Sequence, residues 1–258
     1  MKKVSDLLRI YLSCALLIMP TVYSQSDKDG SINTFLQKVR GVIKGWVYKG
    51  WIRKDNFFEV IPGELYRSSQ LPPSRLEQFI KQYDIKTIVN LSGDEPHYWI
   101  SSYEKELAEK YDIVLFNIKT HALLVTPLDK VRNLLTISLC APLPILFHCF
   151  AGSDRTGEAC ALYMLANDRG IQHAISQLSP RYGHKRWLFP YKYYLITNIE
   201  KMYPDLINNL KLVCSQRYAY DDLKNIPADD LYLKVIDGTV ENNKETDTDK
   251  TDEELTKI

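Results

Sequence analysis

Residues 144–166 read PILFHCFAGSDRTGEACALYMLA. The first five of them, Pro144–His148, are largely apolar, as expected of a short buried strand. The last nine, Glu158–Ala166, form a largely apolar run that predicts a buried helix. Between the two lie small and polar residues, Cys149–Gly157. A buried strand that leads through a short loop straight into a helix is typical of an α/β protein.

Strand and helix patterns alternate upstream of this unit. Strands are predicted at Phe57–Ile61, Leu65–Arg67, Lys86–Leu91, Ile113–Ile118 and Pro144–His148, and helices at Ser74–Tyr83, Tyr98–Tyr111 and Pro127–Leu139. Strands separated by helices predict an α/β fold with a central, mostly parallel sheet flanked by helices on both faces. Such sheets bind ligands beyond the carboxyl ends of their strands, so a ligand is expected at the loop between the last strand and the next helix.

The composition is that of one globular core with appendages. The chain has 258 residues, of which 45% are hydrophobic and 25% charged, and this balance excludes a fibrous or wholly disordered protein. A net charge of +1 argues against a nucleic-acid partner. The five cysteines include no CxxC pair, so neither a disulfide scaffold nor a metal site is expected, and no cofactor is implied.

The loop after the last strand has the residue types of an anion site. If it curls tightly, the backbone amides of its six residues can point inward around a tetrahedral dianion. These predicted phosphate-binding residues are Phe150, Ala151, Gly152, Ser153, Asp154 and Arg155. Gly152 permits the tight curl. The planar guanidinium of Arg155 can hold two phosphate oxygens at once.

The same arrangement favours a thiolate at Cys149. Inward amides and a helix start lower the pKa of a nearby thiol. Thr156 is placed to donate its hydroxyl to the sulfur, and His148 to support the loop from behind through hydrogen bonds to the backbone. A cysteine that merely fills the core would explain neither the arginine nor the glycine at this spacing.

His148, Cys149, Gly152, Arg155 and Thr156 together resemble the signature of the cysteine-dependent protein tyrosine and dual-specificity phosphatase superfamily. The full string, HCFAGSDRTG, is similar to the bacterial and lipid-active branch, in which an aspartate directly precedes the arginine. The resemblance extends over residues 56–194, through the strings at Glu64–Gln70, Thr87–Leu91 and Arg181–His184.

The resemblance implies a phosphomonoester hydrolase. The Cys149 thiolate would attack phosphorus, and water would then hydrolyse the phosphocysteine intermediate. Arg155 and the loop amides would stabilise charge on the equatorial oxygens, with no metal involved. The implied substrate is a protein phosphorylated on tyrosine, or on serine or threonine. A phosphoinositide is the alternative substrate, and a catalytically weak phosphate-binding module is an alternative function.

The proton donor for the leaving group is the least defined part of the site. Most of the superfamily carries an aspartate on a separate upstream loop, but the corresponding stretch here, Lys119–His121, has no carboxylate. The related branch points to Asp154 as the general acid. The remaining candidates are His121, Glu158, Asp94 and Asp129. Alternatively, Asp154 is a structural carboxylate paired with a neighbouring basic residue.

Three further points remain open in this region. Ser153 stands where lipid-active relatives often carry lysine, which weakens the case for a highly phosphorylated inositol. Arg67 is expected either to serve the phosphate site or to form an ion pair under the sheet. A thiol-redox function would need a resolving cysteine near Cys149, and Cys140 and Cys160 are the candidates.

The sequence also predicts the domain boundaries. Residues 1–24 have the charged start, apolar middle and small-residue end of a signal peptide, so export to the periplasm or medium is expected, with an uncleaved anchor as the alternative. Residues 25–55 contain a basic amphipathic helix, whose apolar stripe over 32–52 would contact either an anionic membrane or the main domain. The phosphatase domain is expected at 56–205, a C-terminal extension at 206–238 and an acidic disordered tail at 239–258.

Overall fold

The computed structural model describes residues 55–93, 100–187, 189–214 and 216–240. The predicted signal peptide, the basic segment over 32–52 and almost all of the acidic tail lie outside these residues. Within the described ranges, no helix combines the length and the hydropathy that are needed to cross a membrane.

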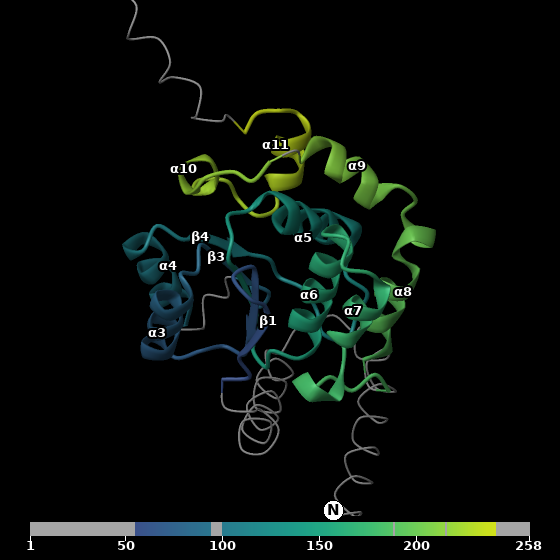
Figure 1. Cartoon of the computed structure of the whole chain (residues 1–258), viewed down its shortest axis with the longest axis horizontal. Helices are drawn as coiled ribbons and strands as arrows, with labels where there is room; N and C mark the ends of the chain where they lie inside the picture. Colours follow the sequence, from purple (N-terminus) through teal and green to yellow (C-terminus); the bar gives the residue numbers. More distant parts are fainter. Residues whose placement is uncertain (1–54, 94–99, 188, 215, 241–258) are drawn as a thin grey trace, which may run out of the picture. The chain divides into compact units, whose positions relative to one another are not determined.

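A central sheet has five strands in the order β1-β2-β5-β3-β4. Their bounds are Phe58–Ile61 (β1), Leu65–Ser68 (β2), Thr87–Asn90 (β3), Val114–Asn117 (β4) and Ile145–His148 (β5). β1 pairs with β2 antiparallel, and every other pairing is parallel. The predicted α/β class with a mostly parallel sheet is therefore confirmed (Figure 1).

β5 lies in the middle of the sheet, with β2 on one side and β3 on the other. All four of its residues are buried, which explains why its sequence is almost continuously apolar. His148 at its end is in register with Ser68 of β2 and Asn90 of β3. The residues that follow β5 therefore emerge at the carboxyl ends of three parallel strands.

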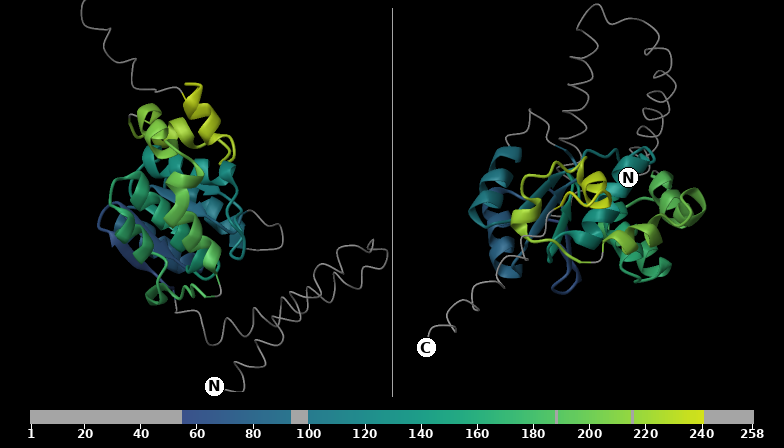
Figure 2. Two further views of the ribbon diagram at one scale, coloured as in Figure 1. Left: turned by 90° about the vertical axis from the view of Figure 1, so that its right-hand side faces the viewer. Right: turned by 90° about the horizontal axis from the view of Figure 1, so that it is seen from above.

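Helices cover both faces of the sheet. One layer is formed by α3 (Pro73–Tyr83) and α4 (Ile100–Lys110), and the other by α5 (Leu128–Cys140) and α6 (Asp154–Ala166) (Figures 1 and 2). Alternate side chains of β5 enter the two layers: Leu146 packs with the α3 and α4 cluster, whereas Ile145 and Phe147 pack with the α5 and α6 cluster.

The chain after α6 adds short helices to the α5 and α6 side. They are α7 (Ile171–Ser176), a 3₁₀ turn η1 (Pro180–Tyr182), α8 (Pro190–Met202), α9 (Leu206–Val213), α10 (Tyr220–Leu223) and α11 (Leu231–Ile236). α8 packs on α6 and α7, and α11 packs on α5. Leu210, Leu223 and Leu231 belong to the same apolar cluster as β5, so this extension is part of the core rather than a separate layer.

α6 begins at Asp154, four residues before the predicted start at Glu158. An acidic side chain in the first turn is favoured by the positive end of the helix dipole, and Asp154 occupies that turn. The expected loop therefore divides into a short curl, Cys149–Ser153, and a first helical turn that carries Asp154 and Arg155.

Candidate active site

Cys149 directly follows the central strand and is only 2% exposed. The curl that begins there turns back at Gly152, whose φ of +69° is in the left-handed region. A Cβ on Gly152 would lie 2.6 Å from backbone atoms of Ser68 and Ser69. Both the dihedral angle and the close approach of β2 therefore require glycine at this position.

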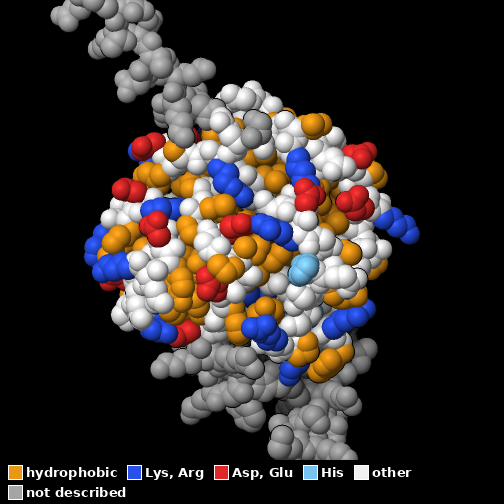
Figure 3. Space-filling view, viewed as in Figure 1, with side chains coloured by type: hydrophobic (Ala, Val, Ile, Leu, Met, Phe, Trp, Pro, Cys, Tyr) orange, Lys and Arg blue, Asp and Glu red, His pale blue; other side chains and the backbone are white. Residues whose placement is uncertain are grey.

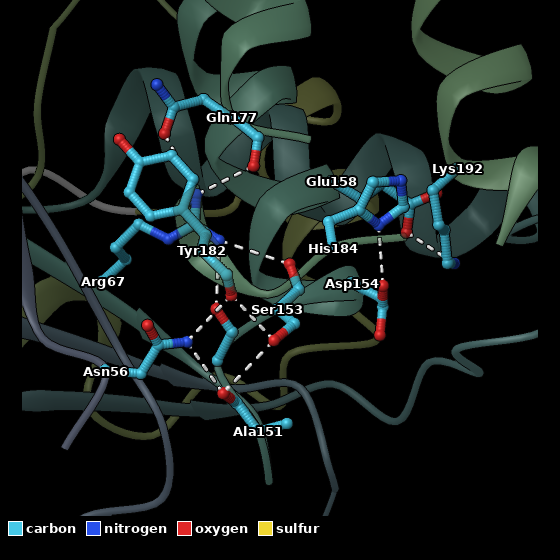
Figure 4. A network of polar contacts seen from close by, with 11 residues as sticks. Asn56, Arg67, Ala151, Ser153, Asp154, Glu158, Gln177, Tyr182, His184 and Lys192 are labelled. Carbon is cyan, nitrogen blue, oxygen red and sulfur yellow. Dashed lines mark hydrogen bonds and ion pairs between the residues drawn. The ribbon is translucent and has the colours of Figure 1, made fainter. Parts of the chain in front are cut away.

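Four successive carbonyl groups of the curl, those of Phe150–Ser153, each accept a hydrogen bond from outside the curl. Their donors are Gln70 N to Phe150 O at 3.2 Å, Asn56 Nδ2 to Ala151 O at 2.9 Å, and Arg67 Nη2 to Gly152 O and Ser153 O at 3.0 and 3.2 Å (Figure 4). With successive carbonyls held on the outer side, the backbone presents its amides to the inner side, as an anion-binding nest requires.

Cys149 lies on this inner side. Burial opposes ionisation of its thiol, but the charge of Arg155 and hydrogen bonds from the Thr156 hydroxyl and the Thr156 and Gly152 amides together lower the pKa of Cys149 below its ordinary value. The Thr156 hydroxyl is buried and has no nitrogen or oxygen partner in the described part of the chain, so it is available to the sulfur. The predicted thiolate-stabilising groups thus lie around Cys149.

Arg155 bridges the ends of two neighbouring strands. Its Nη1 donates to Leu91 O at 3.1 Å and to Thr120 O at 3.5 Å, in the segments that follow β3 and β4. Among the described residues, Nε and Nη2 have no protein acceptor. The side chain is therefore held at one nitrogen, and two donors remain for phosphate oxygens.

Arg67 supports the curl from behind and has no carboxylate partner within the described ranges. Its Nη1 donates to the backbone and side-chain oxygens of Gln177 at 3.0 and 3.1 Å, and its guanidinium lies 3.8 Å from the centre of the Tyr182 ring. Burial lowers its pKa, while the negative ends of nearby groups, including Cys149 and Asp154, act in the opposite direction. Of the two alternatives for Arg67, the ion pair under the sheet is not found within the described ranges, and carbonyl groups of the curl and of Gln177 are its partners instead.

Asp154 contacts a buried histidine. Its Oδ1 lies 2.7 Å from Nδ1 of His184, whose side chain is fully buried, while the side chain of Asp154 is 13% exposed (Figure 4). The Nε2 atom of His184 has no partner among the described residues. In the sequence His184 appears only at the end of the string Arg181–His184, and its spacing of thirty residues from Asp154 gave no sign of this contact.

The other candidate acids are placed less suitably. His121 is exposed in the segment between β4 and α5, Asp129 is exposed in the first turn of α5, and Asp94 lies outside the described residues. Glu158 is 1% exposed and bonded on its Oε2 atom to Lys192 Nζ at 2.7 Å and to Thr126 Oγ1 at 2.7 Å. Burial raises the pKa of Glu158, although both partners act in the opposite direction.

His148 has a different environment from the one expected. Neither ring nitrogen has a hydrogen-bond partner within the described ranges, so the predicted bonds to the loop backbone are absent there. Nε2 lies 3.4 Å from Oε1 of the buried Glu104, and burial lowers the pKa of the imidazole. A neutral ring that packs against the base of the loop is therefore its role in the fold.

The candidate resolving cysteines lie in the packed core. Cys160 is fully buried in α6, and burial raises its pKa to about 11. Cys140, at the end of α5, has the thiol of Cys214 as its hydrogen-bond partner. Across the described residues, no group of three or more His, Cys, Asp or Glu side chains is arranged to hold a metal ion.

Comparison with known sequences gives a match over part of the chain. Residues 50–170 match the sequence model of the tyrosine phosphatase family. No curated protein matches the chain.

Several solved structures are similar to this chain. The core catalytic domain of the PP-IP phosphatase SIW14 from S. cerevisiae is 24% identical, with 64% of this chain and 93% of that one covered and a TM-score of 0.47. P. aeruginosa TpbA is 20% identical, with 65% and 98% covered and a TM-score of 0.45. A phosphatase-like protein from Shewanella putrefaciens is 17% identical, with 59% and 92% covered and a TM-score of 0.44.

Proposed function

We propose that the chain, whose residues 50–170 match the sequence model of the tyrosine phosphatase family, hydrolyses phosphomonoesters through a phosphocysteine intermediate formed on Cys149. Its substrate is a protein phosphorylated on tyrosine, with serine and threonine accepted as well. The observation that carries the proposal is the curl Cys149–Ser153, in which the four carbonyls of Phe150–Ser153 are held from outside while the Cys149 thiol has a lowered pKa.

The first step is an in-line displacement. The Cys149 sulfur forms a bond to phosphorus as the ester oxygen leaves, and the charge that spreads over the three equatorial oxygens is stabilised by the loop amides and by Arg155. Since Leu91 O and Thr120 O hold one nitrogen of Arg155, the fork is oriented before the substrate arrives. In the second step water attacks the phosphocysteine, and the thiolate is released.

Asp154 is the proposed proton donor to the leaving oxygen. It sits in the first turn of α6 next to Arg155, and its bond to the buried His184 fixes the orientation of the carboxyl group. Replacing Asp154 by Asn should slow hydrolysis of a tyrosyl or alkyl phosphate by roughly 10²- to 10⁴-fold. An aryl phosphate with a weakly basic leaving group needs little protonation, so its loss should be much smaller. Equal losses on both substrates would assign Asp154 a structural role.

A phosphoinositide is the second candidate substrate. The acid-bearing string SDRTG, similar to the lipid-active branch, favours it, whereas serine in place of lysine at position 153 weighs against a highly phosphorylated head group. A panel of phosphotyrosyl, phosphoseryl and phosphoinositide substrates at equal concentration separates the two by kcat/KM.

The decisive experiment measures turnover of an aryl phosphate by the full chain and by the Cys149→Ser variant. Serine keeps the shape of the site but is not ionised at neutral pH, so the variant should lose turnover and keep vanadate binding. Residual activity above about 1% of the parent rate would contradict a cysteinyl route. Arg155→Lys should be severely impaired as well, since a point charge does not replace a two-pronged contact.

We further propose export with a mature start near Gln25, on the basis of the charged, apolar and small-residue pattern of residues 1–24. Mass spectrometry of the protein from its native host checks this, and a full-length species in the membrane fraction would instead identify an uncleaved anchor.

A further inference from the structure

Two segments that flank the catalytic curl expose large apolar side chains. The segment after β4 carries Leu123 and Leu124, which are 55% and 58% exposed. The segment that leads into α8, and the first turns of that helix, carry Trp187, Tyr191 and Tyr194, which are 68%, 51% and 53% exposed. Such exposure of a tryptophan and two adjacent leucines needs an explanation, because exposed apolar side chains that cluster on a soluble protein mark an interaction site.

Both segments contact the first turn of α6, which carries Asp154 and Arg155. The first begins at Thr120, whose carbonyl oxygen accepts from Arg155, and the second begins at His184, which contacts Asp154. They also meet each other, because Lys192 Nζ on α8 donates to Thr126 Oγ1 at 2.8 Å. The exposed side chains therefore belong to one rim around the catalytic residues.

The rim is free of negative charge. Residues 113–128 and 169–199 contain no aspartate and no glutamate, although acidic residues flank both stretches. The same stretches carry Lys119, Arg181, Lys185 and Arg186. In Figure 3, the coloured side chains at the lower right, where the chain before α8 reaches the surface, are basic or apolar.

The combination fits a lipid surface better than a peptide. A peptide is usually bound in a groove with pockets for its side chains, whereas these side chains project outward. Projecting tryptophan, tyrosine and leucine side chains enter the boundary between head groups and acyl chains, and lysine and arginine beside them attract anionic lipids.

We propose that this surface docks the catalytic loop onto an anionic lipid bilayer. We call it the rim patch; it consists of Leu123, Leu124, Trp187, Tyr191 and Tyr194 with the four basic residues named above. Phosphomonoesters displayed on that bilayer then reach Cys149 while they remain in the bilayer. This access of phosphomonoesters rests on the proposed hydrolase function, whereas docking itself does not.

Two rim variants and one control test the proposal in the full chain, so that the N-terminal segment is the same in every protein. The apolar variant is Leu124→Ser/Trp187→Ala, and the charge variant is Arg181→Glu/Arg186→Glu. The control is Leu212→Ser/Leu233→Ser, which removes side chains that are 81% and 61% exposed on α9 and α11, outside both rim segments (Figure 1). Equal melting temperatures establish that each variant is folded.

The first measurement is sedimentation with vesicles of phosphatidylcholine that contain about 30% phosphatidylserine. Each rim variant should bind roughly tenfold more weakly than the parent, because an apolar anchor or two cations are lost at the surface. The control should bind like the parent. Equal binding by the parent, the rim variants and the control would overturn the proposal.

The second measurement compares hydrolysis of a vesicle-borne phosphoinositide with that of a soluble aryl phosphate. The rim variants should lose rate on the vesicle substrate and keep the soluble rate. If the parent hydrolyses neither substrate, the proposed function fails, and the sedimentation result still decides docking. If the rim variants lose rate only on an acidic phosphopeptide, and bind vesicles normally, the rim is a peptide site and membrane docking is wrong.

Discussion

Arg67 and Lys192 are both fully buried beside the start of α6, but their partners differ. Lys192 is bonded to the carboxylate of Glu158 and to the Thr126 hydroxyl. Arg67 is bonded to carbonyl oxygens of the curl and of Gln177, and the described ion pairs do not include it. One buried charge is therefore balanced by an opposite charge, and the other is balanced only by dipoles.

This difference separates a structural pair from a contribution to the anion site. The field of Lys192 is largely cancelled by Glu158 within hydrogen-bond distance, whereas the field of Arg67 remains effective at the curl in front of it. The carbonyl dipoles that accept from Arg67 have their paired amides on the inner side, where an anion would bind. We therefore expect loss of Lys192 to reduce stability and loss of Arg67 to reduce catalysis.

The largest effect is expected from Lys192→Met. It leaves the Glu158 carboxyl group buried without its cation, which should lower the free energy of unfolding by about 3–5 kcal/mol. Denaturant melts of the full chain measure this. The pH dependence of Cys149 alkylation should stay as in the parent, and a large change in it would show that Lys192 acts on the thiolate after all.

Arg67→Met should reduce kcat/KM for an aryl phosphate by about 100-fold, comparable to the loss of one donor from an oxyanion hole. It should also raise the pKa of Cys149, because a nearby positive charge favours the thiolate. Iodoacetamide inactivation at increasing pH measures the second effect. The pH at which the inactivation rate rises should be higher in the variant than in the parent.

Arg67→Lys is the matched control for this experiment. It keeps the charge and loses the fork, so it should leave the pKa of Cys149 closer to that of the parent while still slowing turnover. Identical pH profiles for the Met variant and the parent would remove Arg67 from the electrostatics of the site.

The double variant Lys192→Met/Glu158→Leu tests whether the buried pair acts only through charge compensation. Replacing both charges by apolar side chains removes the unpaired carboxyl group. The free energy of unfolding should therefore return to within about 1–2 kcal/mol of the parent value. Failure to recover would mean that the segment of Thr126 depends on the pair for more than charge compensation. Because Thr120 in the same segment accepts a hydrogen bond from Arg155, turnover would then fall as well.

The smallest effect is expected from Asn56→Ala. The variant loses the bonds from Nδ2 to Ala151 O at 2.9 Å and to Tyr182 O at 3.1 Å, and two carbonyls lose a neutral donor. The free energy of unfolding should fall by about 1–2 kcal/mol. Turnover should fall by less than about tenfold, because no charge is removed. A loss of turnover as large as that of Arg67→Met would show that curl geometry, rather than the charge of Arg67, controls the site.

Local patterns in the sequence were sufficient for the sheet and for the residues of the curl. Short apolar runs alternate with helical periodicity, so each strand was placed to within about one or two residues, and the parallel arrangement followed from the intervening helices. The strand, cysteine, glycine, arginine and helix are contiguous in the chain. Their chemistry depends on local backbone conformation, which contiguous residues determine.

Contacts between distant segments were decided by tertiary structure alone. Arg67 and Gln177 are 110 residues apart, Asn56 and Tyr182 are 126 apart, and Lys192 and Thr126 are 66 apart. Nothing in the composition around Arg67 distinguishes a carbonyl partner from a carboxylate partner. Pairing of β2 with β5 brings Arg67 behind the curl, and packing of α8 on α6 brings Lys192 to Glu158. The partners of a buried charge depend on which elements pack together, and that depends on the whole core.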